Sequence, residues 1–313
     1  MNSSILIKKK DKFFVEDVCI ESIIEKFGTP TYIYSKQRIV DNFKNLESAF
    51  KNVDHLICFA VKANSNLAIL NLLAKNGAGF DIVSGGELRR VIAANGDPKK
   101  IVFSGVGKTS EEIKLAIENN ILAFNIESED ELIRIQEIAK SLNKKASISI
   151  RVNPDVNANT HPYISTGLKE NKFGVSEESA LILYKKAKTM DSILIKGIDC
   201  HIGSQITDLK PFEDSVKKLI ALIDKLELVG IKIKHMDIGG GIGISYNNEK
   251  TIAFDDYAKA VFTLTKGRGF KILLEPGRVI MADAGAILTK VEYVKKTQDK
   301  NFAIIDAAMN DLM

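Results

Sequence analysis

Short apolar runs alternate with longer amphipathic segments over most of the chain. A short, nearly continuous apolar run is typical of a strand that is buried on both faces, as the strands of a parallel sheet are. The pattern predicts eight such strands, which are Leu56–Val61, Gly79–Val83, Ile101–Ser104, Leu122–Ile126, Ala146–Val152, Ile195–His201, Lys234–Ile238 and Phe270–Leu274.

The segments between these strands carry apolar residues at helical spacing. Ser128 and Glu131, at the start of one of them, have the spacing of a capping box. The predicted helices are Leu67–Lys75, Gly86–Asn95, Ser110–Asn120, Ser128–Leu142, Ser176–Met190, Phe212–Val229 and Phe254–Gly267. Strand–helix repeats of this kind between residues 56 and 274 predict an α/β fold, namely a closed (β/α)8 TIM barrel.

The two ends of the chain do not follow this repeat. They contain four further predicted strands, Ile5–Ile7, Phe13–Val15, Ile287–Val294 and Phe302–Ile305. These strands would flank the barrel as parts of a second, antiparallel β-domain that is incomplete at residue 313. We therefore expect three parts: N-terminal strands of the β-domain over 1–29, the barrel over 30–283, and the truncated start of the C-terminal β-domain over 284–313.

The composition is that of an ordinary globular protein, with 45% apolar and 27% charged residues among 313. The net charge of +4 is small, and acidic residues soon follow the basic run Lys8–Lys10, so we expect no nucleic-acid partner. The start lacks the features of a secretory signal, and no apolar run approaches the roughly 20 residues that span a bilayer. We expect a cytoplasmic protein without a membrane partner.

Three cysteines, Cys19, Cys58 and Cys200, are too few and too scattered for a disulfide framework or a CxxC metal site. Cys58 and Cys200 lie in strand-like apolar runs, which predicts buried, unreactive thiols. No spacing of His, Cys, Asp and Glu residues suggests a metal site, and we expect none.

Polar and glycine residues follow almost every predicted strand. In a (β/α)8 enzyme the reactive groups lie at the carboxyl ends of the strands and on the loops after them. These positions hold Lys62, Ser84-Gly85-Gly86, Gly105, Glu127, Arg151, His201, Gly239-Gly240-Gly241 and Glu275. The set as a whole predicts an active site at this end of the barrel.

Lys62 follows the apolar run Ile57–Val61. A lysine at a strand end is often a solvated cap, whereas a lysine that forms a Schiff base needs an amine that can lose its proton. Because an apolar neighbourhood lowers the pKa of a lysine, we expect the barrel mouth to favour this chemistry at Lys62.

The run Gly239–Gly243 follows the seventh strand, and Glu275-Pro276-Gly277-Arg278 follows the eighth. A glycine cluster can be a simple tight turn, but the loops after strands seven and eight are the usual phosphate site of a barrel. A carboxylate beside a phosphate must face a cation, and a pyridinium nitrogen would be one. Arg278 could bind a substrate carboxylate or the phosphate with its planar guanidinium.

The histidines differ in position. His201, within His201–Gln205, could be a core residue, but its place at a strand end favours stacking on a planar cofactor, with Ser204 close enough to bind a phosphate. His161 lies in a long segment after the fifth strand, and loops of such length are often functional. His55 and His235 lie at strand starts and receive no role.

Taken together, these stretches resemble fold-type III pyridoxal-phosphate (PLP) decarboxylases. The similar stretches are Phe59–Asn66, Phe80–Glu87, His201–Gln205, Gly239–Gly243 and Glu275–Arg278. Within that group, three stretches resemble the diaminopimelate decarboxylase family specifically: Ser104–Thr109, Arg151–Asp155, and Ile164–Gly167 through Lys172–Gly174. The similarity runs from about residue 29 to residue 313.

The resemblance implies a PLP-dependent carboxy-lyase that converts meso-2,6-diaminopimelate to L-lysine. Lys62 would carry the cofactor covalently, His201 would stack on its ring and Glu275 would pair with the pyridinium nitrogen. A carboxylate there favours a decarboxylase, since related racemases place a cation at this position. The remaining cofactor-binding residues would be Asp81, Arg151, Ser204, Gly239, Gly240, Gly241, Pro276, Gly277 and Arg278, with Arg278 also contacting substrate.

The chain departs from the family at its end. The family's C-terminal β-domain continues beyond this point and supplies further substrate-binding groups, partly across a dimer interface. The resemblance therefore implies a homodimer for the full-length protein, and we expect the chain as given to lack part of the site and to be incomplete for turnover.

Three other functions stay open. The chain could be a PLP decarboxylase of another basic amino acid such as arginine or ornithine, which Ile164–Gly167 and Lys172–Gly174 disfavour. It could also be a non-catalytic PLP-binding protein, or a phosphate-binding barrel that does not use PLP. Lysine release from diaminopimelate would separate an enzyme from the second, and Schiff-base absorption would exclude the third.

Overall fold

The computed structural model describes residues 5–156 and 172–312 of the chain. The chain forms two compact units, of which one is Phe43–Val279 and the other combines Met1–Asn42 with Ile280–Met313. The finer division predicted from the sequence, with boundaries near residues 30 and 283, stays a prediction.

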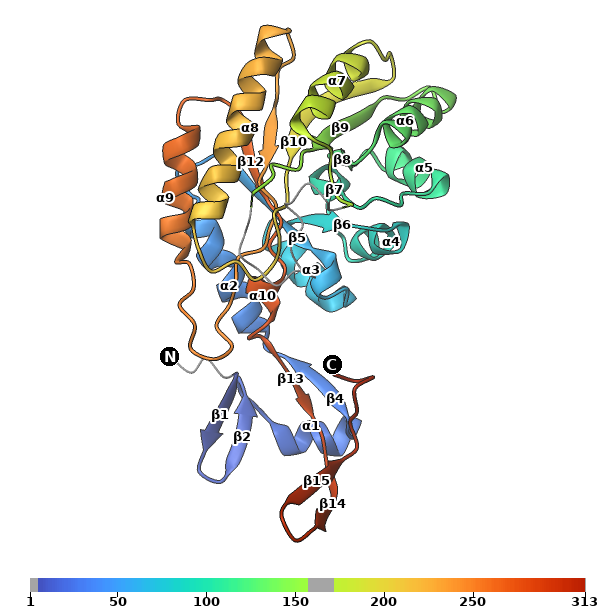
Figure 1. Ribbon diagram of the computed structural model, residues 1–313. Helices are drawn as coiled ribbons and strands as arrows, with labels where there is room; N and C mark the ends of the chain where they lie inside the picture. The colour runs from blue at the N-terminus through green and yellow to red at the C-terminus, as the bar shows by residue number, and fades with distance from the viewer. Residues whose placement is uncertain (1–4, 157–171, 313) are drawn as a thin grey trace. The chain divides into compact units, whose positions relative to one another are not determined.

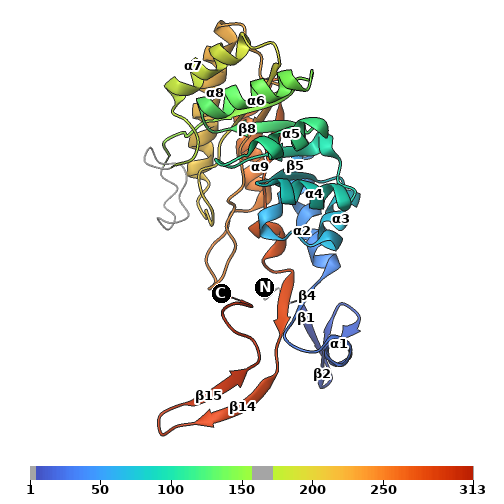
Figure 2. The ribbon, with the colours of Figure 1, turned by 90° about the vertical axis from the view of Figure 1, so that its right-hand side faces the viewer.

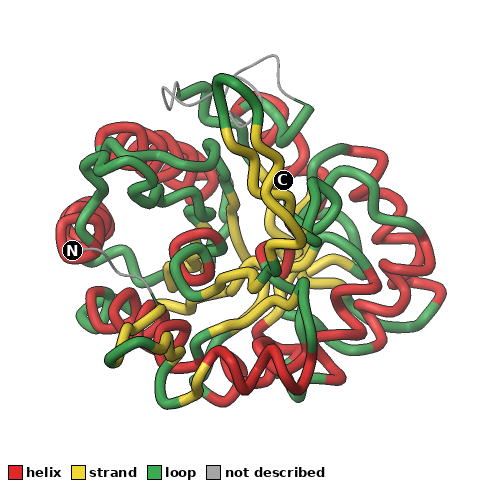
Figure 3. The backbone as a smooth tube through the Cα atoms, turned by 90° about the horizontal axis from the view of Figure 1, so that it is seen from below, coloured by secondary structure: helices red, strands yellow, loops and turns green. Residues whose placement is uncertain are grey.

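The larger unit is a closed barrel of eight parallel strands, as the alternating pattern predicts. The circle closes because β12 pairs with β5 and β9 pairs with β10. In Figure 3 the barrel strands lie inside a ring of helices. The strands are β5 (His55–Ala60), β6 (Gly79–Ile82), β7 (Ile101–Phe103), β8 (Ala123–Ile126), β9 (Ala146–Arg151), β10 (Ile193–Asp199), β11 (His235–Asp237) and β12 (Lys271–Leu274).

Helices follow the barrel strands on the outside (Figure 1). Figure 2 shows α3, α4, α5 and α6 side by side in chain order, and each packs on the next. Only a four-residue helix follows β12. Helix α2 (Lys36–Ala49) precedes β5. The helices that follow the strands are α3 (Leu67–Lys75), α4 (Gly85–Ala93), α5 (Ser110–Glu118), α6 (Glu129–Ser141), α7 (Glu177–Lys188), α8 (Lys210–Leu228), α9 (Phe254–Thr265) and α10 (Arg278–Met281).

The start of α6 differs from the expected capping box. Ser128 caps the helix by accepting a hydrogen bond from the Glu131 amide, but the Glu131 carboxylate binds the amide of Glu127 instead of that of Ser128. The complete capping box lies one helix earlier, where Thr109 and Glu112 each bind the backbone of the other. The carboxylate of Glu131 therefore binds a partner at the strand end and does not complete the cap of its own helix.

The barrel strands are buried, as expected for parallel strands covered by helices. Cys58 and Cys200 are buried as free thiols, and burial raises the pKa of both, which confirms the predicted environment. Four polar residues, Asp81, Asn125, Ser149 and Asp237, are also fully buried within the strands. Burying a polar side chain costs free energy unless it is paired, so these positions point to a site.

The smaller unit is built from antiparallel strands, as predicted. Its predicted strand Ile287–Val294 is wrong as a single element, because β13 ends at Leu288 and β14 begins at Val291. Asp306 holds the break by accepting hydrogen bonds from Thr289 Oγ1 and the Lys290 amide. The elements are β1 (Leu6–Lys9), β2 (Lys12–Val15) and β3 (Val18–Cys19) in one sheet, α1 (Ile20–Phe27), β4 (Thr31–Tyr34) paired with β13 (Gly285–Leu288), and β14 (Val291–Lys296) paired with β15 (Asn301–Ile305).

Candidate active site at the strand ends

The closed barrel brings the predicted site residues to one end. Lys62 lies in the short helix η1 (Val61–Ala63) directly after β5, and Arg151 is the last residue of β9. Strand β10 ends at Asp199, two residues before His201, so the predicted strand Ile195–His201 extends two residues too far. His161 and the stretch 164–167 lie outside the described residues.

Lys62 forms an ion pair with Asp81, with 2.8 Å between Nζ and Oδ2. Asp81 is fully buried, whereas 52% of the Lys62 side chain is exposed. Burial acts to lower the pKa of Lys62, but the charges of Asp81 and Glu275 outweigh it and raise that pKa above its ordinary value. The expected lowering of the Lys62 pKa is therefore wrong for this arrangement, because the apolar strand delivers the amine to buried acids and not to an apolar wall.

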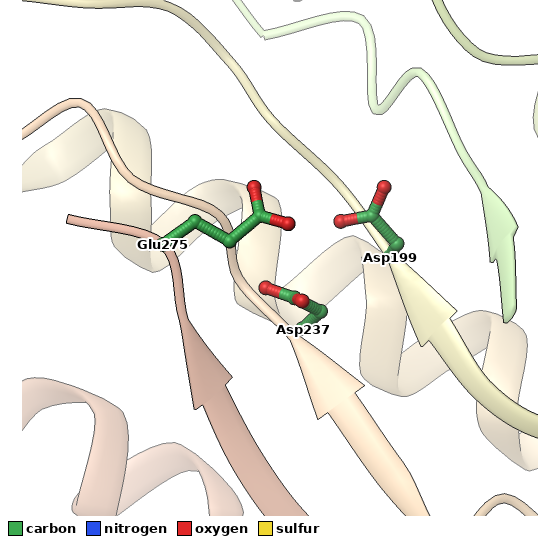
Figure 4. A group of neighbouring side chains, drawn as sticks. All are labelled: Asp199, Asp237 and Glu275. Carbon is green, nitrogen blue, oxygen red and sulfur yellow. The ribbon is translucent and has the colours of Figure 1, made fainter. Parts of the chain in front are cut away.

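Three acids converge from adjacent strands at this end of the barrel. Figure 4 shows the carboxyl groups of Asp199, Asp237 and Glu275 pointing toward one another from the ends of β10, β11 and β12. All three are buried, and an oxygen of each lies within 4.8 Å of the others. Burial and then repulsion by neighbouring acids raise the pKa of all three, that of Asp237 to about 7. Like charges this close cannot all be ionised, so the cluster retains a proton near neutral pH.

Glu275 also lies close to two polar groups, one directly after β7 and one within β8. Its Oε1 lies 3.4 Å from both Ser104 Oγ and Asn125 Nδ2, and these two groups are 3.1 Å apart. The sequence reasoning missed Asn125. Its signal is a polar residue inside the apolar run Ala123–Ile126, where a purely structural strand would carry an apolar side chain.

The glycine run after β11 is required by close backbone approach. A Cβ at Gly240 would lie 2.0 Å from the Glu275 carbonyl oxygen, and one at Gly241 would lie 2.2 Å from that of Gly203. Gly239 and Gly241 also have positive φ angles of 69° and 101°. Among the described residues, the Gly241 amide has no hydrogen-bond acceptor. The loop thus presents backbone, without side chains, between the ends of β10 and β12.

His201 is tied to this loop. Its Nδ1 accepts a hydrogen bond from the Gly240 amide at 3.2 Å. Burial, and then the charges of Arg151 and Lys62, lower the pKa of His201 well below its ordinary value. The imidazole is therefore neutral at physiological pH, and the hydrogen bond to Nδ1 places the proton on Nε2.

Arg278 lies at the start of α10, beside the glycine loop. Nη2 is 3.4 Å from Ser204 Oγ, and Nη1 donates to the hydroxyl of Tyr246, a residue that the sequence reasoning missed. Nε of Arg278 is buried without a hydrogen-bond partner in the described part of the chain. The sequence shows Tyr246 only as an aromatic residue in a polar loop, which gave no reason to place it here.

Arg151 is buried among acids. Its Nη1 lies 3.2 Å from Glu127 Oε1, and its Nε lies 3.9 Å from Asp199 Oδ2. The predicted site residues that the structure describes thus lie at or near the carboxyl ends of the barrel strands and on the loops after them. The structure also adds Glu127 to their surroundings, a strand-end residue to which no role was assigned.

The sequence predicts neither a bound metal nor a membrane-spanning segment. Among the residues that the structure describes, Asp199, Asp237 and Glu275 have carboxylate oxygens close enough together to hold a metal ion, and the expectation of no metal stays a prediction. No helix of residues 5–156 and 172–312 has the length and apolar character to cross a membrane.

Comparison with known proteins identifies the family. The sequence profile for the pyridoxal binding domain of pyridoxal-dependent decarboxylases matches residues 36–282. The chain is 52% identical to diaminopimelate decarboxylase of Pseudomonas aeruginosa over 302 residues, covering 96% of this chain and 73% of that protein. The diaminopimelate decarboxylase of Haemophilus influenzae is 52% identical over 306 residues, covering 97% and 74%. The chain belongs to the diaminopimelate decarboxylase family.

Solved structures of the family have the same fold. Diaminopimelate decarboxylase of Helicobacter pylori, complexed with L-lysine, superposes with a TM-score of 0.90 at 47% identity, covering 93% of this chain and 74% of that one. The enzyme of M. jannaschii superposes with a TM-score of 0.92 at 42% identity, covering 98% and 74%.

The residues at the strand ends fit PLP, the cofactor of this decarboxylase family. Lys62 offers an amine, and the buried Glu275 offers a carboxyl group to a ring nitrogen. The Gly241 amide and Arg278 Nε are donors without an acceptor among the described residues, as an anion site requires. Asp81 Oδ1 is likewise buried and unpaired among those residues.

A first prediction concerns Asp237, which lies in the cluster of three buried acids. Because burial raises the pKa of Asp237 from about 4 in the unfolded chain to about 7, the folded protein binds more protons between these values. Stability must then fall as pH rises through this window. Asp237→Asn removes the titration and keeps an acceptor for the Gly239 amide, now 2.9 Å from Oδ1.

Urea unfolding at pH 5 to 8 measures the free energy of unfolding of both proteins. As pH rises, this free energy should increase for Asp237→Asn relative to the native protein by up to about 1.4 kcal/mol per pH unit. Asp256→Asn, at an exposed acid of the same unit, is the control and should show no such trend. Parallel stability curves for Asp237→Asn and the native protein would mean that no proton is retained at Asp237.

Proposed function

We propose that the full-length protein catalyses the PLP-dependent decarboxylation of meso-2,6-diaminopimelate to L-lysine. The observation that carries this proposal is the 52% identity, over 96% of the chain, to a protein named diaminopimelate decarboxylase. The H. pylori relative with L-lysine bound supports a site that accepts a basic amino acid.

Lys62 and Glu275 would hold the two reactive ends of the cofactor. PLP supplies the electron sink that takes up the electron pair left when CO2 departs. Lys62 would bind it covalently, and the pairing of Lys62 with Asp81 keeps the amine at a fixed place at the barrel end. Glu275 would face the ring nitrogen. Since burial, and then the charges of neighbouring acids, raise the pKa of Glu275, its carboxyl group can hold a proton until a base such as a pyridine nitrogen lies beside it.

His201 would pack against the cofactor ring as a neutral imidazole. Its low pKa excludes a positive charge that would oppose the protonated ring nitrogen. Its hydrogen bond from the Gly240 amide fixes the plane of the imidazole relative to the glycine loop. Asp81 and Arg151 would complete the polar wall.

The phosphate would lie between the loops after β10, β11 and β12. Ser204, the amides of Gly239–Gly241 and of Gly277, and the guanidinium of Arg278 would be its donors. Pro276 supports this arrangement because its carbonyl accepts the Ala60 amide at 3.0 Å, which ties the loop to the strand before Lys62. Arg278 would also contact a substrate carboxylate.

Two further parts of the proposal rest on the family resemblance. We propose a homodimer for the full-length protein and a cytoplasmic location. Cys58 and Cys200, buried as free thiols, are compatible with a reducing compartment.

The activity is tested by assaying the purified full-length protein with four substrates under one condition. Lysine and CO2 should form from meso-2,6-diaminopimelate, while L-lysine, L-ornithine and L-arginine should release far less CO2. Preferred decarboxylation of ornithine or arginine would replace the proposed substrate. PLP uptake without release of CO2 from any of the four would indicate a non-catalytic binding protein.

A second prediction concerns the ring-nitrogen partner. Glu275→Gln should retain PLP but lower kcat by about 100- to 1,000-fold, because a preorganised charge in a buried site is worth several kcal/mol. Lysine release per bound PLP is the measurement, and Glu137→Gln, at an exposed acid of α6, is the matched control. Near-normal turnover by Glu275→Gln would exclude the proposed role of Glu275.

A further inference from the structure

Glu127 lies directly after β8, and its carboxylate joins residues from three other segments. Oε1 accepts hydrogen bonds from the Gly105 amide at 3.1 Å and from Arg151 Nη1 at 3.2 Å. Oε2 accepts one from the Gly174 amide at 2.9 Å. Only 2% of the Glu127 side chain is exposed, so these donors replace water around the carboxylate.

A second buried ion pair fixes the backbone at Glu127. Glu131 accepts the Glu127 amide on Oε2 at 2.9 Å and binds Lys108 Nζ on Oε1 at 2.6 Å. Lys108 Nζ also donates to the carbonyl oxygens of Gly105 and Asn125, at 2.7 and 2.8 Å. All three ammonium donors of Lys108 are thereby used, and the loop after β7 is tied to the end of β8.

The partners of Glu127 come from the three stretches that most specifically resemble the family. Gly105 lies in Ser104–Thr109, Arg151 begins Arg151–Asp155, and Gly174 ends Lys172–Gly174. The proposed function uses only Arg151 among these partners. Their convergence on one carboxylate indicates a shared purpose for them.

Arg151 is the group through which Glu127 reaches the site. Its guanidinium is held between Glu127 and Asp199 and lies 5.0 Å from the centre of the Phe173 ring. Burial acts to lower the pKa of Arg151, but the charges of Asp199 and Glu127, followed by those of site acids, raise it. The charge of Arg151 in turn opposes protonation of Lys62, which places the guanidinium within electrostatic reach of the amine.

Position 174 favours glycine because the backbone there passes close to the backbone of Arg151. The φ angle of Gly174 is +68°, and a Cβ would lie 3.1 Å from the Arg151 carbonyl oxygen. The next residue, Val175, donates its amide to that same carbonyl at 2.9 Å. Glu127 therefore binds both the guanidinium of Arg151 and the amide of Gly174, which lies beside the Arg151 backbone.

We propose that Glu127 is a positioning residue that fixes the guanidinium of Arg151 in the cofactor site. Glu127 acts through Arg151, and the pair Lys108–Glu131 holds Glu127 in place. The inference rests on the proposed function in that Arg151 belongs to the cofactor site. A flexible arginine held by two carboxylates keeps one geometry, and small displacements of site groups are costly in rate.

The test is a double-mutant cycle of Glu127→Gln, Arg151→Gln and the double variant in the full-length holoenzyme. Glu127→Gln should lower kcat per bound PLP by about 10- to 100-fold with a smaller change in KM, and should shift the pH dependence of the bound-cofactor absorption. The double variant should be no worse than Arg151→Gln alone. Glu129→Gln, at an exposed acid two residues away, is the control.

Additive losses in the cycle would overturn the proposal, and so would a Glu127→Gln variant with normal kcat and a normal cofactor spectrum. If Glu127→Gln fails to fold, Glu127→Asp keeps the charge and should bind PLP with reduced kcat; its failure to fold would make Glu127 a purely structural residue and overturn the proposal. A native protein without decarboxylase activity would defeat the proposed function instead, while PLP affinity and absorption would still report the coupling of Glu127 to Arg151.

Discussion

The burial of several carboxylates in one small space is the constraint on which the site depends. Closing a parallel barrel brings all strand ends together, and here those ends carry Asp81, Glu127, Asp199, Asp237 and Glu275, all buried. An isolated buried charge is very costly, so each acid must find a cation, a proton or a hydrogen-bond donor. The contents of the site follow from how this need is met.

The acids are compensated in three ways. Asp81 takes the ammonium of Lys62 and Glu127 takes the guanidinium of Arg151. Burial, and then repulsion between neighbouring acids, raise the pKa values of Asp199, Asp237 and Glu275, so this cluster is compensated by a retained proton. A cationic ring nitrogen beside Glu275 would relieve this repulsion, which gives a physical reason for the barrel to bind a pyridinium cofactor.

The sequence was sufficient to predict the barrel because eight apolar runs with helical segments between them have few other solutions. It also predicted which residues would gather, since the carboxyl ends of parallel strands must meet. It was insufficient for contacts that depend on the third dimension. The pKa of Lys62 was expected to fall because the neighbouring residues in the chain are apolar, whereas its neighbours in space are acids.

The same reason explains the other errors. Glu131 has the spacing of a capping box, but its carboxylate binds Lys108, which is distant in the sequence, and the amide of Glu127, the residue before the cap, instead of the Ser128 amide. Tyr246 reaches Arg278 from a loop that carries no recognisable motif. A break between β13 and β14 is held by Asp306, which lies too far along the chain for a local pattern to reveal it.

We expect this barrel to hold PLP covalently on Lys62. This expectation is tested most directly by incubating the protein with PLP, reducing it with borohydride, digesting it and locating the pyridoxyl group by mass spectrometry. We expect one adduct, on the peptide that contains Lys62, and its loss in Lys62→Ala. An adduct on another lysine, or none in a folded protein, would contradict it.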